Sequence, residues 1–417
     1  MSHSGDRLKI LVLSRNYPNN VLEGLGLWVK RLVCTSAQYC DITVISPVPY
    51  VPPLPLPQYY GRFRQIPKTS SSDGIRVFYP RFLVGPGKMF HYTEAVMYYF
   101  AIRSLVSRLR TTFPFDLIHA HFPVPDGLVA SWLGRQYHVP VIITEHSLWR
   151  PGRMEQQPIM RCQAMRAVRG STFQVAVSRA VKDSIVHFTG EPEKVRVISN
   201  GVDGNMFVPV QPGETRDLNQ ILYVGFLNFN KGIDLLLHAM RELTQRRPQL
   251  KLVLVGGSFY RNTRVQADQL KAMAHDFGLD QCVVFVGNQP PSEVARYMRE
   301  SALLVLPSRG ESFGSVLVEA MACGTPVVAT RCGGPEDIID ESDGALVPQE
   351  DATALAKGIE QVLERRDHYR PDELRRRALE RFSWDRVAVQ TIQLYQEAIR
   401  TAEAMAMKTL SPMGATK

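Results

Sequence analysis

Short apolar runs alternate with amphipathic stretches through the first half of the chain. The apolar runs are rich in β-branched residues and lie at 9–14, 41–46, 116–119, 141–144 and 174–178. Stretches with a helical period separate several of them, including 24–38 and 92–110. Continuous apolar runs that alternate with helices predict a parallel sheet covered by helices on both faces.

The same pattern starts again after residue 203. Its apolar runs lie at 221–224, 251–255, 283–286, 303–306 and 327–329, with expected helices at 234–246 and 315–322. We therefore predict two Rossmann-like α/β domains, with a ligand crevice where the carboxyl ends of the two sets of strands face each other. The predicted boundaries are an N-terminal domain at 1–203, a C-terminal domain at 204–383, a last amphipathic helix at 384–403 and a disordered tail at 404–417.

The region 47–87 breaks this pattern. It contains prolines at 47, 49, 52, 53, 55 and 57. Proline fixes φ and has no N–H group, so helices and central strands are disfavoured there. We expect a long irregular loop or lid, because segments of this length are usually functional.

Composition excludes several classes of protein. The 417 residues are 45% hydrophobic and 21% charged, which is ordinary for a globular chain and excludes wholesale disorder. There is no uninterrupted run of about 18 apolar residues, so no transmembrane helix is expected, and the N-terminus lacks a signal-peptide pattern. The six cysteines form no CxxC pair. We expect core thiols in a reducing cytoplasm and no zinc site.

The positive charge is uneven along the chain. Residues 1–200 carry 24 Lys and Arg against 12 Asp and Glu, whereas residues 201–417 carry 25 against 28. This asymmetry predicts an anionic partner for the first half, such as a membrane surface or a lipid phosphate. A solvated basic surface is the alternative. Nucleic acid is disfavoured, because no nucleic-acid motif accompanies the charge.

The richest motif is the stretch 307–330, PSRGESFGSVLVEAMACGTPVVAT. An apolar strand ends at Pro307, and a short loop leads through Gly314 into an apolar helix. The free N–H groups at the start of such a helix suit a phosphate, and glycine lets the backbone approach it closely. Glu311 precedes this helix, while Glu319 lies inside it. Two carboxylates in these positions suit sugar hydroxyls on either side of a diphosphate.

A second motif, YVGFLNFNKG, covers 223–232. A strand ends at Gly225, and the following loop delivers Lys231 just before a helix. A lysine at this position can neutralise a diphosphate.

The spacing Glu311-x7-Glu319, within ESFGSVLVEAMACGTPVVAT, closely resembles the signature of the family 4 glycosyltransferases. The resemblance extends over about 8–400 and implies the GT-B fold, with a C-terminal helix that crosses back to the N-terminal domain. By this resemblance, Glu311 contacts the donor sugar and Glu319 holds the nucleotide ribose. The diphosphate would bind Lys231 and the backbone amides of Phe313, Gly314, Ser315 and Val316.

Segments of the first half also match the family. Glu23-Gly24-Leu25-Gly26 resembles a glycine loop that approaches the donor phosphate, and His146 resembles a histidine near the donor sugar. By position or resemblance, the acceptor side would include Arg15, Asn16, Tyr17, His121 and Asp126.

The resemblance implies retaining transfer of a hexosyl-type sugar from a UDP- or GDP-sugar to a glycan or lipid-linked acceptor, as in polysaccharide or glycolipid synthesis. No cofactor or metal is expected, and Glu311, Lys231 and His146 are the expected catalytic residues. We expect a cytoplasmic protein, peripheral at the inner face of the membrane.

One residue departs from the family pattern. Phe226 stands where the family usually has an arginine on the diphosphate. Arg261, Arg264 or an arginine of the first half would then have to supply the charge. A catalytically weak or inactive nucleotide-binding scaffold is the alternative function, and hydrolysis or epimerisation of a nucleotide sugar is a further one.

Overall fold

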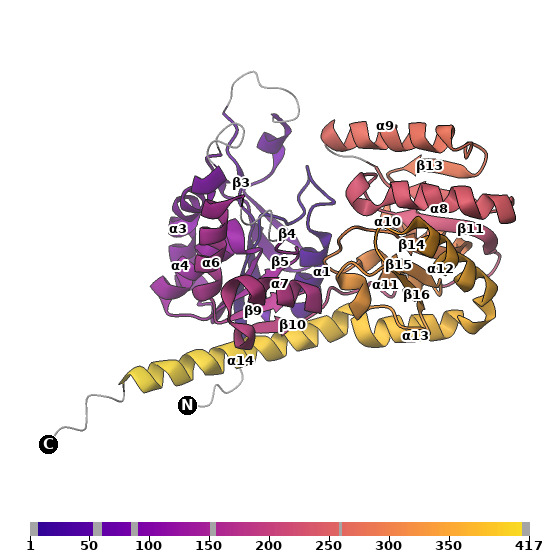
Figure 1. Cartoon of the computed structure of the whole chain (residues 1–417). Coiled ribbons are helices and arrows are strands. Elements are labelled where there is room, and N and C mark those ends of the chain that lie inside the picture. The colour runs from indigo at the N-terminus through magenta and orange to yellow at the C-terminus, as the bar shows by residue number, and fades with distance from the viewer. Residues whose placement is uncertain (1–6, 53–60, 85–90, 151–155, 258–260, 411–417) are drawn as a thin grey trace. The chain divides into compact units, whose positions relative to one another are not determined.

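The computed structural model describes residues 7–52, 61–84, 91–150, 156–257 and 261–410. The chain divides into two compact units. The N-terminal unit comprises 1–177, 181–198 and 387–417, and the C-terminal unit comprises 178–180 and 199–386. The last helix, α14 (Trp384–Leu410), therefore begins in the C-terminal unit and belongs to the N-terminal unit for most of its length (Figure 1). This confirms the predicted returning helix.

The N-terminal unit is built on an eight-stranded sheet in the order β10-β9-β8-β7-β1-β2-β5-β4, with only β4 antiparallel. The strands are β1 (Lys9–Leu13), β2 (Asp41–Ile45), β4 (Thr69–Ser72), β5 (Ile75–Phe78), β7 (Leu117–His121), β8 (Val141–Glu145), β9 (Phe173–Ala176) and β10 (Val195–Val197). The helices are α1 (Leu27–Ser36), α3 (Glu94–Thr112), α4 (Leu128–Tyr137), α6 (Pro158–Arg169), α7 (Arg179–Thr189) and the returning α14.

Alternate residues of the central strands face opposite helical layers. Ile118 and Ala120 of β7 belong to the core that also contains residues of α3, α4 and α6. On the other face, His119 Nδ1 lies 2.7 Å from the hydroxyl oxygen of Tyr395 in α14. Both faces of the sheet are therefore covered, which explains the continuous apolar runs in the sequence.

The C-terminal unit contains a six-stranded, fully parallel sheet in the order β13-β12-β11-β14-β15-β16 (Figure 1). Its strands are β11 (Asp217–Val224), β12 (Lys251–Val255), β13 (Val283–Gly287), β14 (Ser301–Leu306), β15 (Val327–Thr330) and β16 (Gly344–Val347). Its helices are α8 (Ile233–Arg246), α9 (Arg261–Asp276), α10 (Pro291–Glu300), α11 (Ser315–Ala322), α12 (Ala352–Glu364) and α13 (Pro371–Phe382).

The strand order reverses direction once in each sheet. In the N-terminal unit the reversal lies between β1 and β7, and in the C-terminal unit it lies between β11 and β14. The loops after these neighbouring strands leave in opposite directions and open a space at the carboxyl edge. Most candidate residues of both units follow these four strands, while His146 follows β8.

Two sequence predictions were wrong in part. The region 47–87 is not an irregular loop throughout, because β5 pairs with β2 and β4 pairs antiparallel with β5; the short strands β3 (Val48–Pro49) and β6 (Arg81–Phe82) also pair. Asp73 and Gly74 both have positive φ and form the tight turn of this hairpin. The hairpin forms although prolines are frequent earlier in the region. Residues 404–410, predicted to be disordered, continue α14, since alanine, methionine and lysine favour helix. Of the predicted loop and tail, 53–60, 85–87 and 411–417 lie outside the described residues.

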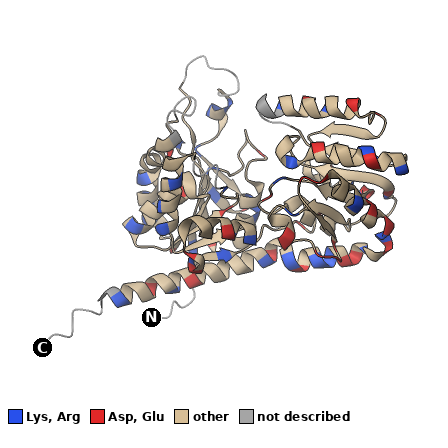
Figure 2. Ribbon diagram, in the orientation of Figure 1, with Lys and Arg blue, Asp and Glu red and all other residues tan. Residues whose placement is uncertain are grey.

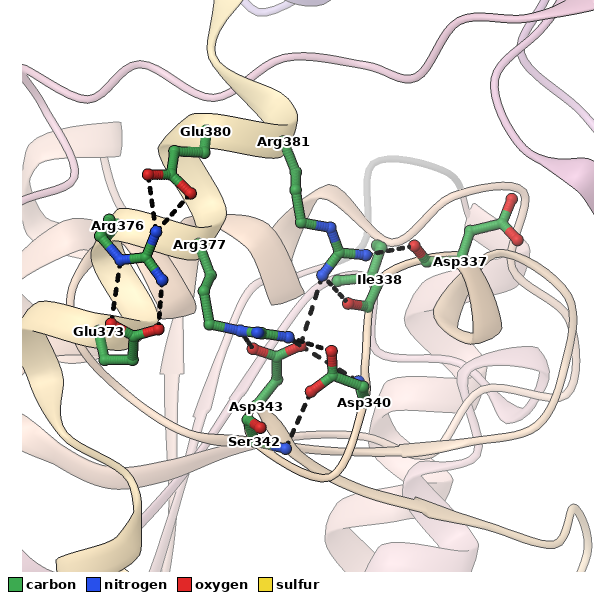
Figure 3. Close-up of polar contacts among 10 residues, drawn as sticks. All are labelled: Asp337, Ile338, Asp340, Ser342, Asp343, Glu373, Arg376, Arg377, Glu380 and Arg381. Carbon is green, nitrogen blue, oxygen red and sulfur yellow. Dashed lines mark hydrogen bonds and ion pairs between the residues drawn. The ribbon is translucent and has the colours of Figure 1, made fainter.

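Helix α13 is anchored to the loop before β16 by a buried carboxylate. Asp343 is fully buried and accepts a 2.8 Å hydrogen bond from Nε of Arg377, while Arg381 donates to the carbonyls of Ile338 and Asp337 at 2.8 Å (Figure 3). The other side of the helix carries the exposed pair Arg376–Glu380. Figure 2 shows that this helix carries residues of both charges.

Candidate active site

In the C-terminal unit the site is built at the reversal point between β11 and β14. The chain leaves β14 at Pro307 and enters α11 through Gly314, whose φ is 98°. Glycine suits this left-handed conformation, and it is the N-cap of the helix. The first N–H groups of α11 have no partner within the helix, so they can bind an anion. Phe313 is buried, and Ser315 and Val316 are half-buried.

Lys231 and Glu311 are brought together across this edge. Nζ of Lys231 lies 2.6 Å from Oε2 of Glu311, although 80 residues separate them in the sequence. Their side chains retain 20% and 17% exposure, so both can reach a ligand. The structure therefore places a cation, a carboxylate and a helix N-terminus side by side, as a charged diphosphate and a sugar require.

The loop that carries Lys231 is held rigidly. Asn228 accepts a 3.0 Å hydrogen bond from the backbone N–H of Lys231. Gly232 has a φ of 67°, and a Cβ at this position would lie only 1.9 Å from the carbonyl oxygen of Pro307. Arg309 forms a bidentate pair with Asp234 at 2.8 Å and also donates to the carbonyl of Phe229. Sequence reasoning missed Arg309, because its partners are distant in sequence.

Glu319 lies in α11, the helix that begins at this edge of the sheet. No hydrogen bond or ion pair of its carboxylate is found among the described residues, and burial raises its pKa to about 7. Ribose hydroxyls can donate hydrogen bonds to such a carboxylate and would favour its charged form.

Glu319 should make the stability of the protein depend on pH. The folded pKa lies above the ordinary value of 4.5, so the folded state binds more protons between pH 4.5 and about 7. Stability should fall as pH rises through this range, by at most about 3 kcal/mol. We expect Glu319→Gln to remove this fall and to be the more stable protein at pH 8. Urea titrations of both proteins at pH 5 and pH 8 measure the difference, and equal pH dependence would contradict the assignment.

A glycine pair completes the edge and was also missed by sequence reasoning. Glu311 pairs with the loop after β15: its N–H donates to Cys332, and its carbonyl accepts from Gly334 at 2.8 Å. A Cβ on Gly334 would lie 2.3 Å from the backbone of Phe313, so only glycine allows this approach. The hydroxyl of Ser308 lies 3.3 Å from the Glu311 carboxylate. The dipeptide Gly333-Gly334 in the sequence was the signal that could have indicated this loop.

Gly225 and Phe226 follow β11 directly. Gly225 has a φ of 154° and its N–H donates to Val255 at 3.0 Å, while Phe226 is 45% exposed. The structure thus places an exposed aromatic ring where the family pattern has a cation. Arg264 is exposed on α9, and the side chain of Arg261 lies outside the described residues.

In the N-terminal unit the loops after β1 and β7 meet as their positions predict. The backbone N–H of Arg15 donates to Asp126 at 2.9 Å, and the Arg15 guanidinium pairs with Glu94. Asp126 is buried, which raises its pKa to about 7. Gly26 caps α1 with a φ of 65°, and a Cβ there would lie 1.9 Å from the carbonyl oxygen of Asn16. Gly24 is exposed, whereas Tyr17 is buried in the core.

The predicted histidines form a cluster. Nδ1 of His121 lies 3.1 Å from Nε2 of His146, with the rings stacked. His119 continues the cluster, with its ring 4.5 Å from that of His121. Burial lowers the pKa of His119 to about 3 and holds the pKa of His121 well below its usual range. Both rings are therefore neutral at pH 7 and can exchange hydrogen bonds but not charge.

A cavity of about 270 Å³ adjoins this cluster and was not expected from the sequence. Its walls include Phe122, Trp149 and Glu145. Glu145 is buried, and it accepts hydrogen bonds from Trp149 Nε1 at 2.6 Å and from the hydroxyl of Ser147 at 2.7 Å. Among the described residues no group of His, Cys, Asp and Glu is arranged to hold a metal ion.

Two family models match the chain, one in each half. Residues 208–381 match glycosyl transferases group 1, and residues 36–205 match Glycosyltransferase Family 4. The D-inositol 3-phosphate glycosyltransferase of Frankia alni is 32% identical over 311 residues, which cover 69% of this chain and 75% of the relative. The protein of the same name from Saccharomonospora viridis is 31% identical, with 70% and 73% covered.

Solved structures with a similar fold cover nearly all of the chain. Sucrose-phosphate synthase from Thermosynechococcus elongatus superposes with a TM-score of 0.73 at 22% identity, covering 94% of this chain and 100% of that one. Anabaena HepE in complex with UDP gives a TM-score of 0.72 at 19% identity, with the same coverage.

Proposed function

Because this chain belongs to the family 4 glycosyltransferases and has the GT-B fold, we propose that it transfers a hexosyl-type sugar, with retention, from a nucleoside-diphosphate sugar to an acceptor hydroxyl. The observation that carries this proposal is the pair Lys231–Glu311 beside the start of α11. Complexes of the similar Anabaena HepE with UDP and UDP-glucose support a UDP-type donor.

The donor would bind to the C-terminal unit. Its diphosphate would accept hydrogen bonds from the N–H groups around Gly314 and face the ammonium group of Lys231. Glu311 would accept a hydrogen bond from a sugar hydroxyl, and Glu319 from the ribose. Glu311 is already paired with Lys231, so its role is to position the sugar rather than to attack the anomeric carbon.

The reaction would proceed by substitution on one face of the sugar. The acceptor oxygen forms the bond to the anomeric carbon as the bond to the diphosphate oxygen breaks. The acceptor proton passes to the leaving diphosphate, whose developing charge Lys231 and the helix N-terminus stabilise. The acceptor would bind to the N-terminal unit near His121, His146 and Asp126, where the neutral ring of His121 can orient a hydroxyl group.

Ligand-dependent thermal stability tests the donor. We expect the melting temperature of the whole chain to rise with one of UDP, GDP, ADP and dTDP, because a ligand at 100 times its dissociation constant adds about 2.7 kcal/mol. The effect should be lost in Glu319→Ala. No shift with any nucleotide would contradict the proposal and favour a scaffold in which Phe226 has replaced the phosphate-binding cation.

We further propose a glycan or lipid-linked acceptor in polysaccharide or glycolipid synthesis, and peripheral binding to an anionic membrane. Helices α3, α4 and α6 carry seven arginines, and their only acidic residue, Glu94, is buried against Arg15 (Figure 2). None of the seven pairs with a carboxylate within the part of the chain that the structure describes. Two apolar residues of these helices are also exposed, Phe100 of α3 by 55% and Ile159 of α6 by 49%. Exposed apolar residues beside arginines that have no carboxylate partner suit the surface of an anionic bilayer. No described helix is long and apolar enough to span a bilayer.

Flotation with liposomes tests the membrane proposal. Each basic residue near an anionic surface contributes about 1 kcal/mol. The double variant Arg103→Gln/Arg166→Gln should therefore bind phosphatidylserine vesicles about 30-fold more weakly than the unaltered protein. The matched variant Arg246→Gln/Arg376→Gln, on exposed arginines of the C-terminal unit, should bind equally well. A protein that stays in the soluble fraction would rule out this part of the proposal.

A further inference from the structure

A second cavity, of about 460 Å³, lies within the C-terminal unit at the amino ends of its strands. Its walls include Arg216, which precedes β11, Ala302 at the start of β14 and Pro326, which precedes β15. The remaining walls come from the end of α12 and the segment that leads into α13. The cavity is therefore at the opposite edge of the sheet from Lys231 and Glu311, which follow the carboxyl ends of β11 and β14.

The cavity is strongly basic. Three arginines line it, Arg216, Arg366 and Arg370, against a single acidic residue, Asp367. Nε of Arg366 lies 3.9 Å from Oδ1 of Asp367, whose side chain is 100% exposed. This carboxylate offsets one of the three positive charges, so the lining keeps a net positive charge.

Arg216 is a half-buried cation without a carboxylate partner among the described residues. Its guanidinium donates to the carbonyls of Arg299, Gly324 and Cys323 and to the hydroxyl of Thr325. All four acceptors are neutral, and a guanidinium has five N–H donors. Burial lowers its pKa, which reflects the cost of keeping this charge out of water. An anion in the cavity would offset that cost.

The other walls are apolar. Leu218 is 46% exposed, while Val362 and the ring of Tyr369 are buried. A volume of about 460 Å³ is within the range of pockets that hold small organic molecules. The cavity thus combines positive charge with a surface against which a small ring or chain can pack.

We propose that this cavity is a second ligand site, which binds a phosphate-bearing small organic molecule through Arg216, Arg366 and Arg370. This goes beyond the proposed transfer reaction, which uses the opposite edge of the sheet. Arg216 also holds the carbonyls of Cys323 and Gly324, which immediately follow α11, the helix that carries Glu319. A phosphate bound to Arg216 would therefore lie next to the C-terminal end of α11, whose N-terminal end forms part of the donor site.

Calorimetric titration of the full chain with glucose 6-phosphate tests the site, in a buffer without phosphate or nucleotide. We expect Arg366→Gln/Arg370→Gln to weaken binding at least about tenfold, because each arginine removed loses a charge-assisted hydrogen bond to the phosphate. The matched variant Arg365→Gln/Arg386→Gln removes the same charge from exposed positions outside the cavity and should bind as the unaltered protein does.

Further titrations separate the alternatives. Lys231→Met should leave glucose 6-phosphate binding unchanged, which distinguishes this cavity from the donor site. Inorganic phosphate should bind more weakly than the ester, since it cannot pack against the apolar walls. Equal binding of phosphate and ester would overturn the proposal of an organic ligand. Equal losses in both double variants, or no heat at about 5 mM ester, would overturn the site itself.

Discussion

Lys231→Met should lower kcat for sugar transfer by about 10²–10³-fold, with a smaller change in KM. In the proposed reaction the ammonium group stabilises charge that develops on the leaving diphosphate, so its loss acts mainly on the transition state. The 2.6 Å contact of Nζ with Glu311 places this charge at the edge where α11 begins. Initial rates with the donor identified by thermal stability measure the effect.

Two controls separate chemistry from structure. Lys357→Met removes an exposed lysine of α12 in the same unit and should keep full activity. Lys231→Met/Glu311→Gln removes both members of the pair, so no unpaired carboxylate remains and any misfolding caused by one should be relieved. A less than fivefold loss in Lys231→Met would contradict the role of Lys231 and favour a different source of positive charge at the diphosphate.

Asp343→Asn should destabilise the C-terminal unit by about 2–3 kcal/mol, because it removes a buried charged acceptor, although Arg377 keeps Asp340 as a second partner. Asp343 is fully buried, and its carboxylate raises the pKa of Arg377 through a 2.8 Å hydrogen bond (Figure 3). A second guanidinium, that of Arg381, lies 3.5 Å from the same carboxylate. Urea denaturation followed by circular dichroism measures the loss.

The same helix supplies the control. Glu380 pairs with Arg376 at 2.7 Å, but both side chains are more than half exposed. Water screens this pair, so Glu380→Gln should cost less than about 1 kcal/mol. If the two variants were equally stable, burial would not distinguish the two ion pairs and the anchoring role of Asp343 would be wrong.

The sequence predicted the α/β architecture because a parallel strand that is buried on both faces is a continuous apolar run in the sequence. Six strands coincide with apolar runs of the sequence that were predicted to be strands: β1, β7, β8, β11, β12 and β14. The hairpin of β4 and β5 was missed, because the proline-rich stretch before it concealed a turn at Asp73-Gly74. Local turn chemistry decided the structure there.

The candidate site was predicted residue by residue, but its contacts were not. Motifs identified Lys231, Glu311 and Glu319, and strand order explains why the first two meet at one edge of the sheet. The supporting residues Arg309 and Gly334 carry no local signal of their role. Their importance follows from a bidentate pair with Asp234 and from a close approach to Phe313, both of which depend on packing.

The sequence by itself determined the fold class, the family and the residues at the ends of the strands, because these depend on periodicity and on short motifs. The tertiary structure alone decided which distant groups share an environment. It buried Asp126, His119 and His121, and it gathered Arg216 and Arg370 around one cavity. Burial and proximity set pKa values and binding chemistry, and both arise from contacts between segments that are far apart in the chain.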